Sequence, residues 1–163
     1  MASSPSTNLL TTLAQASVEF ILVGGLAAVA QGAPLTTLDV DIVHRRTTDN
    51  LERLVSCLLG IDARYRGRPV GDIVRPASAI LSGPGHSLLQ TSFGPLDVLG
   101  AIEGGRDYDQ LLPDSIEIMV GDHRIRTLRL ETLIELKKMS NRPKDRLTLL
   151  ILEATMQDRD RGP

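Results

Sequence analysis

The sequence predicts a single α/β (or α+β) domain, in which helices pack on a mixed β-sheet and a short pair of helices ends the chain. Apolar runs rich in Val, Ile and Leu alternate with helical segments at first, β-type runs dominate the middle, and two helical stretches follow. A chain of 163 residues is long enough for one domain with an adequate core. No linker, repeat or low-complexity tract divides residues 1–163, so the final helices, within residues 130–156, are expected to pack on the rest.

The first third of the chain alternates between helical and extended patterns. Leu9, Leu10 and Leu13 have helical spacing, and the pair Gly24-Gly25 separates an apolar strand from the next helix. The expected helices are residues 8–17, 26–31 and 50–59, and the expected strands are residues 18–23 and 38–44.

The second part begins with residues 61–79, which fit either short strands or an irregular excursion. After it, Gly94-Pro95 and Gly121-Asp122 are turn pairs between β-type runs, and Pro143 suits the first turn of a helix. The expected strands are residues 87–93, 96–99, 115–120 and 124–128, the expected helices are residues 130–139 and 143–156, and residues 1–7 and the tail from 157 are expected to be loose.

Composition excludes several classes of protein. Aromatic residues are only 2%, too few for an aromatic platform that stacks on single-stranded nucleic acid, and the net charge of −2 provides no overall basic field. One cysteine, Cys57, excludes an intrachain disulfide and is expected to be a small buried hydrophobe. The apolar run at residues 20–30 lacks a basic flank and is far shorter than a membrane span, so we expect a cytoplasmic protein without membrane partners.

Asp39 and Asp41 alternate along the expected strand 38–44, so both side chains should project from one face together with Thr37. At about 3.3 Å per residue they lie about 6.6 Å apart, which suits ligands of two metal ions. Asp97, between apolar neighbours in PLDVLG, would complete a carboxylate cluster if its strand lies beside the first. The alternatives are a solvated polar face for the pair and a turn or edge position for Asp97.

Phosphate-binding candidates flank these aspartates. Gly24 and Gly25 leave backbone N–H groups available to an anion, or simply form a tight turn. Lys137 extends the apolar stripe of its helix, so it either reaches the surface or enters a cleft to meet phosphates. Residues 64, 66 and 68 are arginines that would share a face if extended, contacting an acidic or nucleic partner or only solvent.

Four motifs together resemble the nucleotidyltransferase superfamily of the DNA polymerase β type, and especially its small bacterial abortive-infection and toxin–antitoxin branch. They are VGG at residues 23–25, TLDVDI at 37–42, PLDVLG at 95–100 and LETLIELKKMSNRPKD at 130–145, within a likeness that spans about residues 18–152. Many superfamily members have Gly-Ser where this chain has Gly24-Gly25.

The resemblance implies a nucleotidyltransferase fold and assigns roles to residues. Asp39, Asp41 and Asp97 would be catalytic and hold two Mg²⁺ ions, with Mn²⁺ as the alternative, and Asp97 would help to deprotonate the acceptor. Gly24 and Gly25 would cradle the triphosphate of a nucleotide such as ATP, and Lys137 would neutralise it. Thr37 is included among the expected nucleotide-binding residues.

The implied reaction moves an NMP from an NTP to a hydroxyl group and releases pyrophosphate. An RNA end, a protein and a small molecule remain open as acceptors, and a cognate antitoxin or another partner chain is an expected partner. Two alternatives stand beside this function: a non-catalytic nucleotide-binding or partner protein that retains the fold, and a D-x-D glycosyltransferase.

Overall fold

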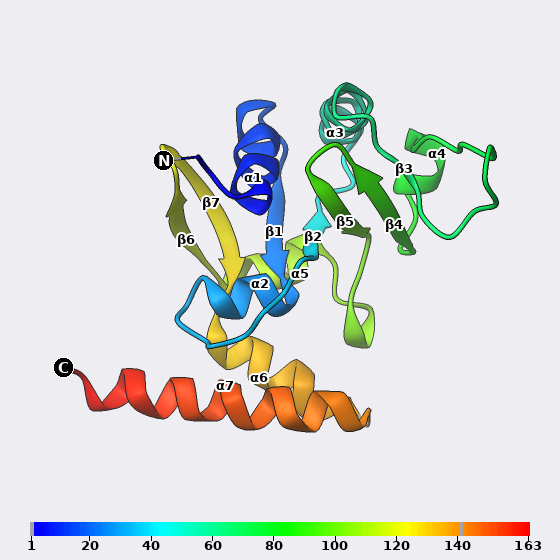
Figure 1. Ribbon diagram of the computed structural model, residues 1–163. Helices are drawn as coiled ribbons and strands as arrows, with labels where there is room; N and C mark the ends of the chain where they lie inside the picture. The colour runs from blue at the N-terminus through cyan, green and yellow to red at the C-terminus, as the bar shows by residue number, and fades with distance from the viewer. Residues whose placement is uncertain (1, 141) are drawn as a thin grey trace.

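A mixed sheet of seven strands, in the order β3-β4-β5-β2-β1-β7-β6, forms the centre of the computed structural model, which describes residues 2–140 and 142–163 (Figure 1). Met1, in the expected loose N-terminal segment, and Asn141, in the C-terminal motif, lie outside the described residues. The strands are β1 (Phe20–Val23), β2 (Val40–His44), β3 (Arg64–Tyr65), β4 (His86–Thr91), β5 (Gly94–Leu99), β6 (Ser115–Val120) and β7 (His123–Leu128).

Strand β2 lies at the middle of this sheet. It runs antiparallel to β1 and parallel to β5, and β1 in turn runs parallel to β7. All four residues of β1 are buried, as expected for a strand covered on both faces. The fold class expected from the sequence, a mixed sheet with packed helices, is therefore confirmed.

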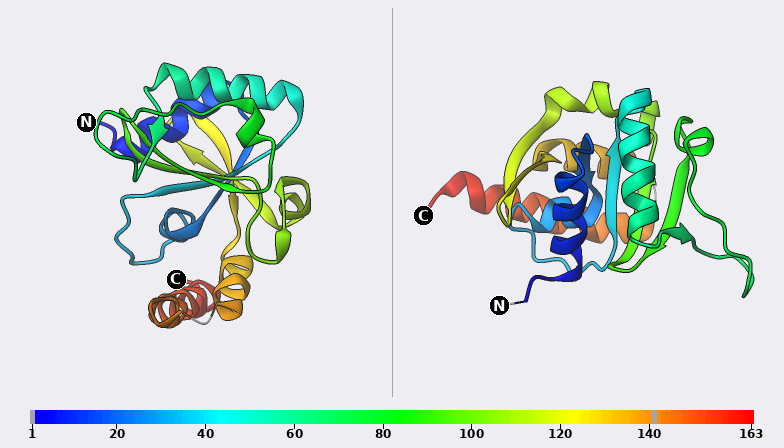
Figure 2. Two further views of the ribbon diagram at one scale, coloured as in Figure 1. Left: turned by 90° about the vertical axis from the view of Figure 1, so that its right-hand side faces the viewer. Right: turned by 90° about the horizontal axis from the view of Figure 1, so that it is seen from above.

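Helices cover both faces of the sheet. Figures 1 and 2 show α1 and α3 on one side, and α2, α6 and α7 on the other. Leu133 and Leu152, from the last two helices, belong to the same buried cluster as the central strands. None of the helices formed by the described residues has the length and apolar character needed to cross a bilayer. The helices are α1 (Pro5–Gln15), α2 (Gly24–Val29), α3 (Thr48–Gly60), α4 (Ser78–Leu81), α5 (Tyr108–Leu111), α6 (Leu130–Met139) and α7 (Pro143–Arg161), with short 3₁₀ turns η1 (Glu103–Gly105) and η2 (Leu112–Asp114).

Both ends of the chain are more helical than expected. Helix α1 begins at Pro5, because the Ser4 hydroxyl accepts a hydrogen bond from the backbone N–H of Thr7 at 3.2 Å and so caps the first turn. Helix α7 continues to Arg161, so the prediction of a loose tail from residue 157 was wrong for most of that tail. In both places a polar segment was assumed to be disordered, although it contains a cap or continues a helix.

The expected strand 38–44 also begins later than predicted. Strand β2 starts at Val40, and Leu38 and Asp39 precede it, with Leu38 largely exposed. The Thr37 hydroxyl accepts a hydrogen bond from the Asp39 backbone N–H at 3.3 Å, a local turn that competes with ladder hydrogen bonds. Residues 61–79 combine the two alternatives, since two-residue β3 and four-residue α4 are joined by irregular chain.

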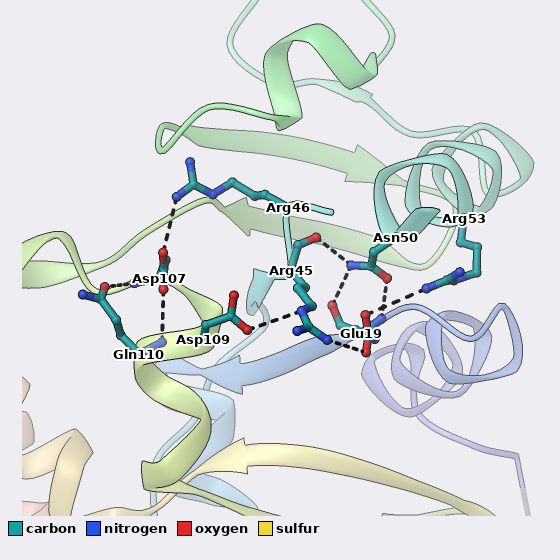
Figure 3. Close-up of polar contacts among 8 residues, drawn as sticks. All are labelled: Glu19, Arg45, Arg46, Asn50, Arg53, Asp107, Asp109 and Gln110. Atoms are coloured by element: carbon teal, nitrogen blue, oxygen red, sulfur yellow. Dashed lines mark hydrogen bonds and ion pairs between the residues drawn. The ribbon is translucent and has the colours of Figure 1, made fainter. Parts of the chain in front are cut away.

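A polar network with buried Asn50 at its centre joins the ends of β1 and β2 (Figure 3). The fully buried side chain of Asn50, on α3, accepts a hydrogen bond from the Glu19 N–H and donates to the carbonyls of Glu19 and Arg45. The Arg45 guanidinium pairs with Glu19 at 3.2 Å and lies 3.3 Å from Asp109. The network lies at the end of β2 that is opposite Asp41.

Candidate active site

Asp41 on β2 and Asp97 on β5 are direct partners in the parallel ladder. Their neighbours in the ladder, Val40 with Leu96 and Ile42 with Val98, are completely or almost completely buried on the opposite face. Because side chains alternate along a strand, the two half-buried carboxyl groups share the other face of the sheet. The condition set by the sequence, that the strand of Asp97 must lie beside that of Asp41, is confirmed.

The surroundings of Asp41 disfavour its charge. Burial is the largest cause, followed by the charge of Asp97 and a hydrogen bond to it, and together they raise the pKa of Asp41 to about 7. The charge of Asp39 raises this pKa further, and the charge of Lys137 lowers it. A carboxyl group that resists ionisation beside other carboxylates is a common feature of functional sites.

Asp39 lies at the exposed rim of the cleft, outside the strand that was expected to carry it. Across residues 2–140 and 142–163, no three or more His, Cys, Asp or Glu side chains are gathered closely enough to hold a metal ion. The structure therefore brings Asp41 and Asp97 together and leaves Asp39 nearby, where its charge still acts on Asp41.

The chemistry of these donors nevertheless fits a divalent cation. Asp41 is half-buried between two acidic neighbours, and neither Asp39 nor Asp41 takes part in an ion pair with the described residues. Carboxylate oxygens are the ligands that Mg²⁺ prefers, and a bound cation removes the repulsion that raises the pKa of Asp41. Asp41 and Asp97 would hold such an ion, and Asp39 is placed to contribute from the rim.

A cleft of about 510 Å³ opens over these carboxylates. Its walls come from the start of α2, the chain before β2, strands β4 and β5, and helices α6 and α7. All seven residues proposed from the sequence line it, which are Gly24, Gly25, Thr37, Asp39, Asp41, Asp97 and Lys137.

Gly24 allows the backbone to approach Asp41. Its φ of +71° is in the left-handed region that favours glycine, and a Cβ atom there would lie 2.3 Å from Oδ2 of Asp41. Gly25 differs, because a Cβ atom there would meet Thr37 at 3.4 Å, an ordinary contact. Of the two glycines, Gly24 is thus the one that the carboxylate geometry requires.

We expect Gly24→Ala to be far more damaging than Gly25→Ala. The left-handed backbone alone should destabilise the first variant by roughly 1–2 kcal/mol, and the new methyl group must displace the Asp41 carboxylate. Thermal unfolding of both variants, with and without Mn²⁺, checks this. Equal stability and equal response to Mn²⁺ in the two variants would contradict this account of Gly24.

Lys137 enters the cleft from α6, and a buried carboxylate holds it there. Its Nζ donates to Oδ1 of Asp145 at 2.9 Å, and Nε of Arg142 donates to the other carboxylate oxygen at 2.7 Å. The side chain of Asp145 is fully buried, and hydrogen bonds from Ser140, Lys137 and Arg142 hold its pKa well below the usual range. Lys137 is therefore fixed at the wall of the cleft rather than free at the surface.

Sequence reasoning missed two site residues. Asp145 was interpreted only as a favourable charge in the first turn of a helix, although its spacing from the lysine across a helix junction is a usable signal. Arg66 contacts Asp97 at 2.7 Å, which settles the open choice between an acidic partner and solvent for this arginine. No local pattern could indicate that contact, because 31 residues separate its partners.

Two other residues are structural. His44 is buried and its ring Nε2 pairs with the carbonyl of Leu81 at 2.7 Å, while burial lowers its pKa. Cys57, on α3, packs against the core as expected but is half-buried rather than fully buried, and this burial raises the pKa of its thiol.

Comparison with known proteins finds similarity in structure but not in sequence. No protein-family model matches the chain, and no curated protein is significantly similar to it. The lincosamide antibiotic adenylyltransferase LnuA, in its lincomycin-bound crystal structure, superposes with a TM-score of 0.62 at 15% identity, covering 93% of this chain and 96% of LnuA.

Two further solved structures also superpose on this chain. The antibiotic-resistance factor ANT(2'')-Ia has a TM-score of 0.56 at 11% identity, covering 93% of this chain and 82% of its own. A nucleotidyltransferase-like antigenic protein from Paracoccidioides brasiliensis also has a TM-score of 0.56, at 14% identity, covering 93% and 73%. The chain therefore has the nucleotidyltransferase fold that the resemblance of its motifs implies.

Proposed function

We propose that this protein is a metal-dependent nucleotidyltransferase, which moves an NMP from an NTP to a hydroxyl group and releases pyrophosphate. The observation that carries the proposal is the pairing of Asp41 with Asp97 on adjacent strands, on the floor of a cleft of about 510 Å³. The fold shared with LnuA and ANT(2'')-Ia supports it.

The residues of the cleft would have different roles in the proposed transfer. Asp41 and Asp97, with Asp39 from the rim, would hold Mg²⁺ or Mn²⁺, which when bound stabilises negative charge on the attacking and leaving oxygens. Lys137, held by Asp145, would neutralise the triphosphate next to Gly24, Gly25 and Thr37. Asp97 would accept the proton of the acceptor hydroxyl as its oxygen attacks the α-phosphorus and pyrophosphate leaves.

A small molecule is the acceptor that we favour over an RNA end or a protein. Strands β4 and β5 and the turn η1 contribute His86, Leu88, Leu99 and Glu103 to the cleft, and this set without Lys or Arg suits a neutral or cationic compound better than a polyanion. LnuA is described as a lincosamide antibiotic adenylyltransferase, and ANT(2'')-Ia has been crystallised with adenylyl-2"-tobramycin. ATP is accordingly the nucleotide that we propose.

The resemblance to toxin–antitoxin nucleotidyltransferases leads us to retain a cognate antitoxin as a proposed partner. A non-catalytic protein with the same fold is the second candidate, favoured by one observation: among the described residues no three His, Cys, Asp or Glu side chains are gathered closely enough to hold a metal ion. The D-x-D glycosyltransferase has no comparable support, since the similar structures are nucleotidyltransferases.

A direct assay tests the proposal. Purified protein is incubated with each α-labelled NTP and Mg²⁺, alone, with bulk tRNA, and with a panel of aminoglycosides and lincosamides. We expect pyrophosphate release and a labelled small-molecule product with ATP. An Asp122→Asn variant, changed at an exposed turn, should behave like the wild type.

The outcomes separate the candidates. Labelled tRNA would keep nucleotidyl transfer but overturn the small-molecule acceptor. Binding of nucleotides without any product, including pyrophosphate, over the whole panel would favour the non-catalytic protein. If none of the NTPs binds or protects the protein against unfolding, the proposal is rejected altogether.

A further inference from the structure

Arg66 reaches the candidate active site from the edge of the sheet. It directly follows β3, and its backbone N–H donates to the carbonyl of Leu88 on β4 at 2.9 Å. Its side chain then spans β4, because Nη1 donates to the carbonyl of Leu89 at 2.8 Å and Nη2 donates to Oδ1 of Asp97 at 2.7 Å. The guanidinium group is therefore held at two points, one of which is a proposed catalytic carboxylate.

This ion pair differs from the others in the same segment. The side chains of Arg66 and Asp97 are only 28% and 19% exposed, whereas those of Arg68 and Asp72 are 45% and 44% exposed. Exposed pairs contribute little to stability or orientation, but a guanidinium anchored on a carbonyl can fix a partly buried carboxylate in one orientation. The Arg66 contact therefore orients Asp97, and the Arg68 contact only joins two points of a surface segment.

We propose that Arg66 is a positioning residue for the reaction, holding Oδ1 of Asp97 so that Oδ2 is directed to the cation and the acceptor hydroxyl. This inference rests on the proposed nucleotidyl transfer. It has two consequences of opposite sign. The fixed positive charge beside Asp97 weakens cation binding, while the fixed orientation of the carboxylate speeds the transfer.

An inhibitory contact is the competing explanation, since a guanidinium on Asp97 could also block the site until it is displaced. The two explanations agree that loss of Arg66 strengthens cation binding, because a like charge is removed. They disagree about the rate, which falls if Arg66 positions Asp97 and rises if Arg66 blocks it. A purely structural pair would change neither quantity.

The test measures both quantities on the full chain. Mn²⁺ affinity is read from the electron paramagnetic resonance signal of free Mn²⁺, and transfer is followed with Mg²⁺, ATP and the acceptor identified by the assay above. The variants are Arg66→Ala and Arg66→Lys, with Arg68→Ala as the matched control, because Arg68 is also paired with an aspartate in the same segment. Circular dichroism and thermal unfolding establish that each variant is folded.

For Arg66→Ala we expect Mn²⁺ to bind roughly fivefold more tightly, and kcat to fall roughly tenfold to a hundredfold with little change in the KM for ATP. Arg66→Lys keeps the charge but not the two-point geometry, so its Mn²⁺ affinity should match that of the wild type while its kcat stays low. Guanidinium ions added to Arg66→Ala should restore part of the rate, and Arg68→Ala should be unchanged in both measurements.

Faster transfer by Arg66→Ala would overturn the positioning role in favour of an inhibitory contact. Unchanged Mn²⁺ affinity and unchanged kcat would show a structural pair and overturn it as well. If the wild type transfers no nucleotide, the proposed function fails, and the Mn²⁺ measurement alone then decides whether Arg66 acts on Asp97. An equal loss of rate in Arg68→Ala would also count against a specific role for Arg66.

Discussion

Replacing Asp41 with asparagine is expected to reduce nucleotidyl transfer by roughly a thousandfold or more while making the metal-free protein more stable at pH 8. The rate falls because the variant loses a carboxylate that would hold the cation, a loss comparable with removing a group that stabilises transition-state charge. Stability rises because the neutral amide would place no charge beside Asp97. A residue that served only the fold would lose stability on substitution, not gain it.

The pH dependence follows from the raised pKa of Asp41, about 7 in the folded protein against an ordinary value of 3.8. The folded state therefore binds more protons than the unfolded state between about pH 4 and pH 7, so this stabilisation is complete at low pH and is lost as the pH rises through 7. After allowance for the partial exposure of the carboxyl group, we expect the loss to be about 1–2 kcal/mol.

Urea unfolding of the wild type and Asp41→Asn at pH 5 and pH 8.5, each with and without Mg²⁺, measures this effect. Asp41→Asn should be more stable than the wild type only at pH 8.5 in the absence of the cation. Mg²⁺ should stabilise the wild type but not Asp41→Asn. Asp122→Asn, at the exposed β6–β7 turn, controls for a general charge effect. If Asp41→Asn is less stable than the wild type at both pH values, the ionised Asp41 carboxylate does not destabilise the metal-free fold, and this explanation is refuted.

The sequence predicts this pair of carboxylates well, for a physical reason. Alternation of apolar and acidic residues in VDIV and LDVL defines which face each aspartate occupies, and burial of Val40, Ile42, Leu96 and Val98 follows from the same alternation. What alternation cannot give is the order of strands. The sequence left the placement of the Asp97 strand beside the Asp41 strand as a condition, and in the structure β5 does pair with β2.

Other features depended on side-chain contacts, which hydrophobic periodicity does not report. The start of β2 is displaced by a side-chain turn at Thr37, which removes Asp39 from the strand face it was predicted to share. Arg66 contacts Asp97 across 31 residues of sequence, whereas Asp145 lies only 8 residues from Lys137, a spacing that could have been used. Both contacts join polar side chains, whereas sequence periodicity reports only burial.

The importance of Asn50 for stability is likewise not evident from the sequence pattern. We expect Asn50→Ala to destabilise the protein by about 2–4 kcal/mol. Its side chain is fully buried and makes three hydrogen bonds to backbone groups that flank β1 and β2. The Glu19 carbonyl keeps a second partner, the backbone N–H of Arg45 at 3.1 Å. The Glu19 N–H and the Arg45 carbonyl would lose theirs, and each buried group without a partner costs about 1–3 kcal/mol.

Two further variants isolate the cause. Ser56→Ala changes an exposed position of the same helix and should alter the free energy of unfolding by less than about 0.5 kcal/mol. Asn50→Asp keeps the acceptor for the Glu19 N–H but places a carboxylate against the two carbonyls that the amide now serves. It should therefore be even less stable than Asn50→Ala at pH 8, and should recover part of the loss at low pH, where the protonated acid donates one hydrogen bond.

Urea unfolding measures these changes in stability, and the same variants also test whether the Asn50 network influences the metal site. The network and the carboxylate pair lie at opposite ends of one five-residue strand. His44 pairs with Phe20 next to the network, and Asp41 pairs with Val23 next to the cleft. If the network fixes the register of β1 against β2, Asn50→Ala should weaken Mn²⁺ binding as well as stability. If it only closes the end of the sheet, stability should fall while Mn²⁺ affinity stays that of the wild type, since the ladder between Val40 and Val43 with β5 would still hold Asp41 beside Asp97.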